Sequence, residues 1–297
     1  MRNSEIMNKH KGNDEKRRNK SNVIITFSNA KHGDFLTDHW LHSLMVNVDL
    51  SDIDVVVLDY GLNKKQLEKL KRAKVKIVKC ECDGHITAVR FRDMADFLRK
   101  NNYDQVLSCD GGDVIFQTDI SDIFEKDKDA LRAACEGYRM PFEKLSLSLQ
   151  KSITPAIAAE VKKYNGRMRK MINAGVIIGP RKKFIELCDF CYNNITGKKF
   201  GPDMVLVNYF LYKHNFVELD CRYNFILYTS RVPFVIKDGK FYDDSGKLIP
   251  IVHNAGWLSP IRAIASFGYG PKHNRIRLGR FYLLRTLIKT FNVLFYS

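Results

Sequence analysis

Residues 22–110 alternate between short apolar runs and segments whose apolar residues recur with helical spacing, and this rhythm limits the fold more than any other feature. The apolar, strand-like runs are 22–29, 53–62, 74–80 and 103–110. The helical patterns between them are 35–48, 64–73 and 89–102. Strands buried on both faces read as continuous apolar runs, and strands that alternate with helices are typical of a parallel sheet. The sequence therefore predicts an α/β fold with a mostly parallel sheet flanked by helices.

The composition agrees with one α/β domain that carries extensions. A chain of 297 residues, 45% of them hydrophobic, is long enough to bury a sizeable core. The seven cysteines are an odd number and no secretory signal peptide is visible, so we expect a reducing, cytoplasmic location without a disulfide framework. Cys188 and Cys191 lie in a helical pattern without a second pair, which favours core packing over a metal site.

The net charge of +16 is unevenly distributed along the chain. Residues 1–22 hold seven Lys or Arg against three acids, which predicts a disordered basic leader over residues 1–21. No acid follows Asp244, and the last 53 residues hold eight Lys or Arg. We therefore divide the chain into the leader, a main domain over 22–271 and a basic amphipathic tail over 272–297. The charge of the tail requires an anionic partner.

Polar residues gather where the predicted strands end. Thr26 and Asn29 end the first strand, Asp59 ends the second, and Asp-Gly-Gly-Asp at 110–113 follows the fourth. Ligands of open α/β sheets bind at the carboxyl ends of the strands. Two carboxylates on a glycine turn with positive φ form a site for Mg²⁺ or Mn²⁺, which prefer hard oxygen ligands. The alternative is an Asp-Gly hairpin turn without a ligand.

Four sequence blocks, in order, resemble the nucleotide-sugar-dependent glycosyltransferases of the GT-A fold, especially glycosyltransferase family 8 and its relatives. The blocks are IITFSN, YDQVLSCDGGDVIFQTDISDIF, MINAGVIIGPRKKF, and the group of GPDMVLVNYFLYK, DCRYNF and IVHNAGW. The second block resembles the D-x-D strand of that family. The resemblance, which extends over roughly residues 22–260, implies a Rossmann-like GT-A catalytic domain with a basic helical C-terminal extension.

The resemblance also implies a bound Mn²⁺ or Mg²⁺. Asp113 matches the second aspartate of the D-x-D motif, and His253 matches the late histidine, so both would ligate the metal. Asp110 would assist, although Gly111 and Gly112 make the motif one residue longer than in the family. The alternative for His253 is a histidine that is satisfied within the core.

The donor and acceptor contacts are implied by the same resemblance. The expected donor-binding residues are Thr26, Asn29, Asp59, Arg92, Asp110, Gly111, Gly112 and Gly256. We favour Arg92 over Arg90, which then belongs to a solvated helix face. Asn173 and Gly175 would border the acceptor, and Asp203 would contact the transferred sugar. The alternative for Asp203 is a helix N-cap after Gly201 and Pro202.

The sequence departs from the family at two further positions. Met204 stands where the family has a glutamine, and Ser259 stands where it has a phosphate-binding lysine. Arg262, two residues beyond Pro260, is a candidate to supply the missing charge. These departures leave the identity of the donor open.

The implied function is metal-dependent hexosyl transfer from a nucleotide sugar, most readily a UDP-sugar, to a glycan or glycolipid. Retention of configuration and a role in surface polysaccharide or lipopolysaccharide synthesis follow from the same resemblance. One alternative is an inactive homologue that acts as a binding subunit. Another is a basic nucleic-acid-binding protein, but no recognisable module supports it and we expect no nucleic acid partner.

Two basic segments remain. The stretch 274–297 mixes Phe, Tyr and Leu with Arg and Lys, and its apolar runs are too short to span a bilayer. It predicts an interfacial helix that holds the enzyme on the inner face of the cell membrane, unless this helix simply docks on the catalytic domain. The stretch 137–170 is helical and basic, which indicates either an anionic acceptor or a solvated face.

Overall fold

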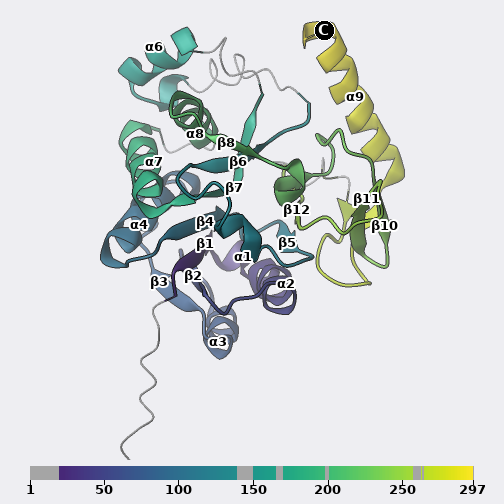
Figure 1. The fold of residues 1–297 in the computed structure, drawn as a ribbon, viewed down its shortest axis with the longest axis horizontal. Helices are drawn as coiled ribbons and strands as arrows, with labels where there is room; N and C mark the ends of the chain where they lie inside the picture. The colour runs from purple at the N-terminus through teal and green to yellow at the C-terminus, as the bar shows by residue number, and fades with distance from the viewer. Residues whose placement is uncertain are drawn as a thin grey trace, which may run out of the picture.

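The computed structural model describes residues 20–138, 150–164, 170–197, 201–256, 262 and 264–296. The expected disordered leader lies outside these ranges except for its last two residues, so it stays a prediction. A central sheet with helices on both faces forms the body, and smaller sheets and a long C-terminal helix lie beside it (Figure 1).

Seven strands form the central sheet in the order β3-β2-β1-β4-β7-β6-β8. Their bounds are β1 Asn22–Ser28, β2 Ile53–Asp59, β3 Lys76–Lys79, β4 Gln105–Cys109, β6 Arg132–Cys135, β7 Ile172–Pro180 and β8 Val217–Leu219. All neighbouring pairs are parallel except that β7 runs antiparallel to both β4 and β6. The predicted mostly parallel sheet is therefore confirmed.

Helices cover the two faces of this sheet because alternate strand residues point to opposite sides. On one face lie α1 Ala30–Phe35, the π-helix η1 Leu36–Trp40, α2 Leu41–Asn47 and α3 Lys64–Arg72. On the other lie α4 Ile86–Lys100, α7 Arg181–Asn194 and α8 Pro202–Lys213. Ile24 of β1 packs in the first core and Ile25 in the second, and both are fully buried. The cysteines of α7, Cys188 and Cys191, are also fully buried, as the core interpretation predicted.

A small sheet beside the main one determines which residues meet at the candidate site. It joins β5 Val114–Phe116, β12 Ile251–His253 and β9 Phe225–Ile226, with β12 in the middle. Because β5 pairs with β12 and not with β4, the Asp-Gly-Gly-Asp segment does not close a β4–β5 hairpin. The hairpin alternative is thereby removed.

The remaining described elements are short or peripheral. They are η2 Ser121–Phe124, η3 Gln150–Ser152, α6 Pro155–Tyr164, η5 Cys221–Asn224, β10 Phe234–Lys237, β11 Lys240–Asp243, β13 Ile264–Ala265 and β14 Arg275–Ile276. Of the basic stretch 137–170, residues 139–149 and 165–169 lie outside the described ranges. Lys162 and Lys163 are exposed on α6, at the far side of α8 from the sheet (Figure 1).

The C-terminal helix α9 Leu278–Tyr296 extends along the outside of the molecule from the β10–β11 hairpin (Figure 1). Phe281 is buried and its ring packs edge-on against Phe234 at 5.6 Å. Residues just after the expected tail boundary at residue 272 contact residues before it: β14 pairs with β13, and Asn274 is buried among backbone carbonyls. The division into domains stays a prediction. Within the described residues, no helix is both long and apolar enough to cross a membrane.

Candidate active site

The carboxyl edge of the central sheet brings together residues that are far apart in the sequence. Asp110 directly follows β4, Asp113 directly precedes β5, and His253 is the last residue of β12. The pairing of β5 with β12 sets His253 opposite Val114. The backbone N–H of Asn254 also donates to the carbonyl of Asp113 at 2.9 Å. Strand pairing therefore fixes His253 beside the second carboxylate.

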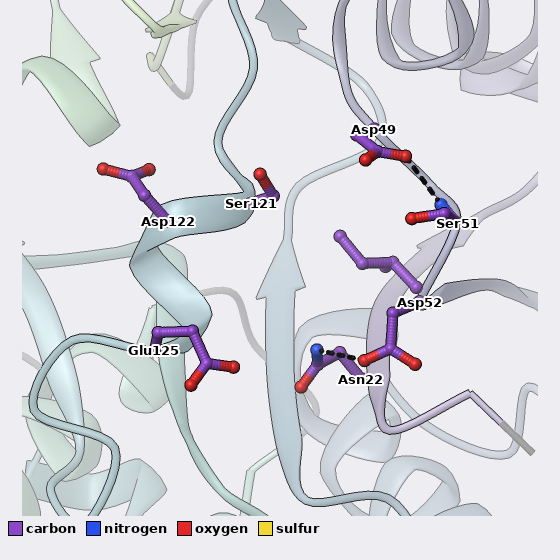
Figure 2. A pocket seen from close by; sticks show the side chains of 8 residues that line it. Asn22, Asp49, Ser51, Asp52, Ser121, Asp122 and Glu125 are labelled. Carbon is purple, nitrogen blue, oxygen red and sulfur yellow. Dashed lines mark hydrogen bonds between the residues drawn. The ribbon is translucent and has the colours of Figure 1, made fainter.

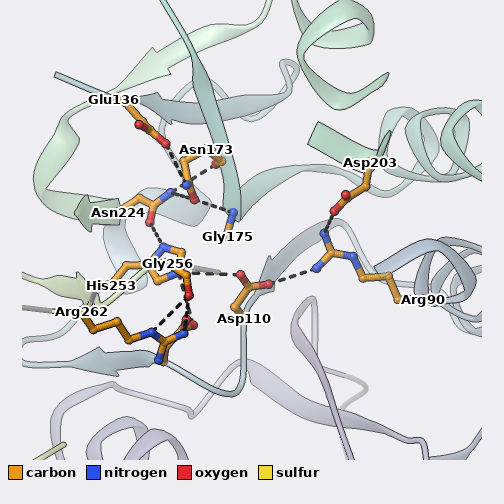
Figure 3. A network of polar contacts seen from close by, with 11 residues as sticks. Arg90, Asp110, Glu136, Asn173, Gly175, Asp203, Asn224, His253, Gly256 and Arg262 are labelled. Atoms are coloured by element: carbon orange, nitrogen blue, oxygen red, sulfur yellow. Dashed lines mark hydrogen bonds and ion pairs between the residues drawn. The ribbon is translucent and has the colours of Figure 1, made fainter. Parts of the chain in front are cut away.

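Three potential ligand atoms converge at this edge (Figure 3). Nε2 of His253 lies 3.3 Å from Oδ1 of Asp113 and 3.7 Å from Oδ2 of Asp110. The three side chains each offer one atom, and these atoms all lie within 4.8 Å of one another. The additional glycine in the motif therefore does not separate the two carboxylates.

Two arginines hold the outer oxygens of the carboxylates. Nη1 of Arg90 donates to Oδ1 of Asp110 at 3.0 Å, and Nη2 of Arg262 donates to Oδ2 of Asp113 at 2.9 Å. Each carboxylate thus has one oxygen on a guanidinium and one oxygen facing His253. Charge-assisted hydrogen bonds are short and strong, so they orient the inner oxygens without occupying them.

Burial and neighbouring charges shift the pKa of all three groups. Burial raises the pKa of Asp110, and the Arg90 guanidinium offsets this only in part. Burial also acts to raise the pKa of Asp113, but His253 and Arg262 outweigh it and the pKa is lowered. For His253, burial acts to lower the pKa, whereas the two carboxylates raise it, and the net shift is upward.

The donor set fits a divalent cation. Two carboxylate oxygens and an imidazole nitrogen suit Mn²⁺, and the oxygens also suit Mg²⁺. The side chain of His253 is 3% exposed and that of Asp113 14%, whereas that of Asp110 is 31% exposed. The cluster is therefore closed on the histidine side and open on the side of Asp110, where a substrate can complete the coordination.

Glycines at this edge leave room for neighbouring side chains, because they have no Cβ atom. We expected positive φ in the motif, but neither Gly111 nor Gly112 has it. A Cβ on Gly111 would lie 2.6 Å from Oγ1 of Thr26, so the motif packs directly on β1. A Cβ on Gly175 would lie 2.2 Å from Cε1 of His253, so the imidazole rests on bare backbone. Close approach, and not an unusual turn, explains these two positions.

Of the two arginines on α4, Arg90 lies in the site and Arg92 lies outside it. Arg90 is 5% exposed, and its Nη2 donates to Oδ2 of Asp203 at 3.1 Å while Nη1 holds Asp110. Arg92 instead pairs with acids outside the site, among them Asp83 at 2.7 Å. Two positions along a helix differ by about 200° in direction, so only one of the pair can face the sheet edge. Arg90, and not Arg92, therefore faces the site, while a contact of either arginine with a donor stays a prediction.

Asp203 lies in the first turn of α8, whose N-cap is Gly201. The residue is buried, and one of its oxygens is bonded to Arg90. Its Oδ1 has no hydrogen-bond partner in the described part of the chain. Burial raises the pKa of this carboxyl group. A buried oxygen without a partner is costly, and a hydrogen-bond donor of a bound ligand can satisfy it.

A chain of side-chain hydrogen bonds leads away from His253 on the side opposite the carboxylates (Figure 3). Nδ1 of His253 lies 2.9 Å from Oδ1 of Asn224, and Nδ2 of Asn224 lies 3.2 Å from Oδ1 of Asn173. Nδ2 of Asn173 donates to Oε1 of Glu136 at 3.1 Å. Of these partners, sequence reasoning named only Asn173. Asn224 stands in the DCRYNF block and was within reach, whereas Glu136 follows β6 without any motif.

The other expected donor contacts lie along the same edge. Asn29 caps α1, and Asp59 accepts hydrogen bonds from the two backbone N–H groups that follow Tyr60. Oγ1 of Thr26 is buried without a partner in the described ranges. The carbonyl of Gly256 accepts from Arg262 at 3.0 Å. Contacts of these residues with a donor stay predictions.

A second group of acids surrounds a pocket at the opposite, amino end of the sheet (Figure 2). This pocket of about 300 Å³ is lined by Asn22, Asp49, Ser51, Asp52, Ile53, Ser121, Asp122 and Glu125. Its four acids are exposed. Two of these acids accept hydrogen bonds from neighbouring groups: the backbone N–H of Ser51 donates to Asp49, and Nδ2 of Asn22 donates to Asp52. In the described ranges, only the carboxyl edge assembles three potential metal ligands.

This architecture is the GT-A fold, as predicted. Among solved structures, the chain resembles an active-site mutant of LgtC, with a TM-score of 0.52 and 14% identity over 89% of this chain and 95% of that one. It also resembles the bifunctional glycosyltransferase WbbM in its apo form, with a TM-score of 0.52 and 14% identity over 92% of this chain. The match covers 52% of WbbM. No protein-family model and no curated protein sequence matches the chain.

Proposed function

We propose that the chain is a metal-dependent glycosyltransferase that moves a hexose from a nucleotide sugar to a glycan or glycolipid. One observation carries the proposal: Asp110, Asp113 and His253 converge at the ligand-binding edge of a GT-A sheet. A fold alone hosts many functions, so the argument rests on the chemistry of this site. A UDP-sugar is the expected donor, because the resemblance to family 8 implies it.

The three convergent side chains would hold Mn²⁺ or Mg²⁺. The bound cation would neutralise the negative charge that develops on the leaving diphosphate. Arg262, on the outer oxygen of Asp113, places a further positive charge beside the same position. It can therefore take the role of the lysine that the family has where this chain has Ser259, a residue outside the described ranges.

The transferred sugar would lie between the cation and α8. Asp203 offers its unpartnered Oδ1 to a sugar hydroxyl, and Arg90 keeps this carboxylate in place. Asn173 lies at the start of β7 on the other side of His253, where the resemblance implies the acceptor. Retention of the anomeric configuration and a role in surface polysaccharide or lipopolysaccharide synthesis are the expectations that this resemblance adds.

Donor hydrolysis tests the proposal. Purified full-length chain should slowly hydrolyse one member of a UDP-sugar panel in the presence of Mn²⁺, and the rate should fall to background with EDTA. Asp113→Ala is the matched inactive control. Folded protein that binds a nucleotide sugar with Mn²⁺ but hydrolyses none would support the inactive-homologue alternative. The anomeric configuration of the product, read by NMR, decides between retention and inversion.

The helix α9 supports attachment to the inner face of the cell membrane. Its exposed apolar side chains include Leu278, Tyr282, Leu283, Leu287 and Leu294. Basic residues such as Arg280 and Lys289 are also exposed on this helix. Apolar groups can enter the head-group layer while each basic group near an anionic surface contributes about 1 kcal/mol.

Liposome binding tests this attachment. The full chain should sediment with vesicles of anionic lipid at low salt and be released at high salt, because counterions screen the attraction. A chain that ends at Arg277 keeps β14 and should stay in the supernatant with its donor hydrolysis intact. Equal sedimentation of the two proteins would show that α9 is not the attachment site.

A further inference from the structure

We propose that Asn224, Asn173 and Glu136 form a one-way hydrogen-bond chain that fixes the tautomer of His253. In this chain, Nδ1 of His253 carries a proton and Nε2 directs its lone pair toward the inner oxygens of Asp110 and Asp113. The inference deepens the proposed metal-dependent function and rests on it for its metal readout. Asn224 is a positioning residue, since it acts on the metal site only through His253.

The donor and acceptor at each step of this hydrogen-bond chain follow from one backbone N–H group. The N–H of Gly175 lies 2.9 Å from the side-chain oxygen of Asn173. A backbone N–H can only donate, so the atom of Asn173 that faces it must be the carbonyl oxygen. The amide nitrogen of Asn173 then faces Oε1 of Glu136, a carboxylate acceptor. Both contacts agree with a single orientation of this amide.

The orientation of Asn224 follows from that of Asn173. One side-chain atom of Asn224 lies 3.2 Å from Oδ1 of Asn173 and 3.2 Å from the backbone carbonyl of the same residue. Both neighbours are acceptors, so this atom must be the amide nitrogen of Asn224. The remaining side-chain atom of Asn224, which faces His253, is therefore the carbonyl oxygen.

The tautomer of His253 is then determined. Its Nδ1 lies 2.9 Å from the carbonyl oxygen of Asn224, and two lone pairs at this distance would repel each other. Nδ1 must therefore carry the hydrogen. Nε2 lies farther from its nearest carboxylate oxygen, at 3.3 Å, so the shorter contact at Nδ1 decides the tautomer of the neutral ring and leaves Nε2 as the ligating nitrogen. Histidines that ligate metals commonly donate their other N–H to such a partner, and loss of the partner lowers metal affinity.

Packing holds the imidazole ring of His253 in the orientation that this hydrogen-bond chain requires. His253 and Asn224 are 2% and 4% exposed, and the space for a Cβ at Gly175 is filled by the imidazole. Water therefore has little access to Nδ1 as a replacement for Asn224. The carboxylate of Glu136 ends the chain as an acceptor that needs no proton of its own.

Nitrogen-15 NMR of the histidine ring tests the tautomer in the metal-free protein. At a pH where the ring is neutral, we expect a protonated Nδ1 and an unprotonated Nε2 in the wild type. A predominant Nε2–H form would overturn the proposal, whether or not the protein binds a metal. This measurement needs no variant and does not depend on the proposed transferase activity.

Manganese titration of a variant tests the consequence. Asn224→Ala should lower the affinity for Mn²⁺ by about 10- to 100-fold and shift His253 toward a mixture of tautomers. Asn274→Gly is the matched control: it removes a buried amide far from the site, and glycine tolerates the local φ of 72°. Unchanged Mn²⁺ affinity in Asn224→Ala, with a melting temperature lowered as in the control, would show that Asn224 only stabilises the fold. If the wild type binds no Mn²⁺, the proposed function fails, and the NMR result still decides the tautomer.

Discussion

The two ends of the central sheet both gather carboxylates, but they arrange them differently. At the carboxyl edge, Asp110 and Asp113 each have one oxygen on an arginine and one oxygen turned toward His253. At the amino end, four exposed acids line a pocket, and two of them, Asp49 and Asp52, accept hydrogen bonds from neighbouring groups (Figure 2). Negative charge is present at both ends, whereas oxygens that converge on one point are found only at the first.

This difference shows what a cation site requires. Exposed carboxylates keep their hydration and their rotamer freedom. Metal binding must therefore offset the free-energy cost of dehydrating and ordering these side chains. At the carboxyl edge, folding has already ordered the three potential ligands, and Arg90 and Arg262 hold the oxygens that do not face the candidate metal position. The comparison predicts that substitutions at the two ends differ greatly in their effect on metal binding and catalysis.

The largest effect is expected for Asp113→Ala. The loss of this ligand should reduce transfer by about 1,000-fold or more, because charge stabilisation of the leaving group depends on the cation. Mn²⁺-dependent donor binding should also disappear in calorimetry. Asp110→Ala should be less severe, since its side chain is the more exposed of the two. Wild-type activity of Asp113→Ala at saturating Mn²⁺ would contradict the assignment of the metal site.

Gly175→Ala should have the next largest effect. The new Cβ would lie 2.2 Å from Cε1 of His253 and 2.8 Å from Oδ1 of Asn173, so the imidazole must move. We expect Mn²⁺ affinity to fall by about 10- to 100-fold, as for the loss of a group that orients a ligand. Gly279→Ala is the control, because nothing lies within 4 Å of its Cβ position. Equal Mn²⁺ affinities for the two variants would contradict the close packing of His253.

The pH dependence of stability should separate the metal-free and metal-bound states. Although burial acts to lower it, the carboxylates raise the pKa of His253 above its ordinary value of 6.5. A raised pKa in the folded state stabilises the fold below about pH 6.5, and this contribution is lost as pH rises through the folded pKa. Mn²⁺ needs the deprotonated ring, so the rise in melting temperature caused by Mn²⁺ should grow with pH. In His253→Gln this growth should vanish, and a pH-independent Mn²⁺ effect in the wild type would contradict the competition between proton and metal.

The smallest effect is expected at the amino end. The double substitution Asp52→Asn with Glu125→Gln should change Mn²⁺ affinity by less than about twofold and stability by about 0.5 kcal/mol or less, as for ordinary surface positions. Isothermal titration and thermal melting would measure both. A clear loss of Mn²⁺ binding in this variant would mean that the acidic pocket is itself a cation site.

The fold could be predicted from the sequence because its signals are local. Buried parallel strands read as continuous apolar runs, and Gln105–Cys109 followed by an acid marks the edge where ligands bind. The direction of β7 was not predictable, since an apolar run such as Ile172–Pro180 looks alike in parallel and antiparallel pairs. The sequence could not decide which of Arg90 and Arg92 faces the sheet edge, because it shows that the two point in different directions but not which one faces the sheet.

By itself, the sequence determined the α/β architecture and the basic, aromatic character of the C-terminal helix, and it predicted a metal-type chemistry for Asp110 and Asp113. Only the tertiary structure decided that β12 pairs with β5 and thus brings His253 to those carboxylates. It also decided that Asn224 and Glu136 belong to the same network. The physical reason is that hydrophobic patterning can be recognised in residues that are close in sequence. The candidate site instead depends on contacts between strands that lie more than 100 residues apart.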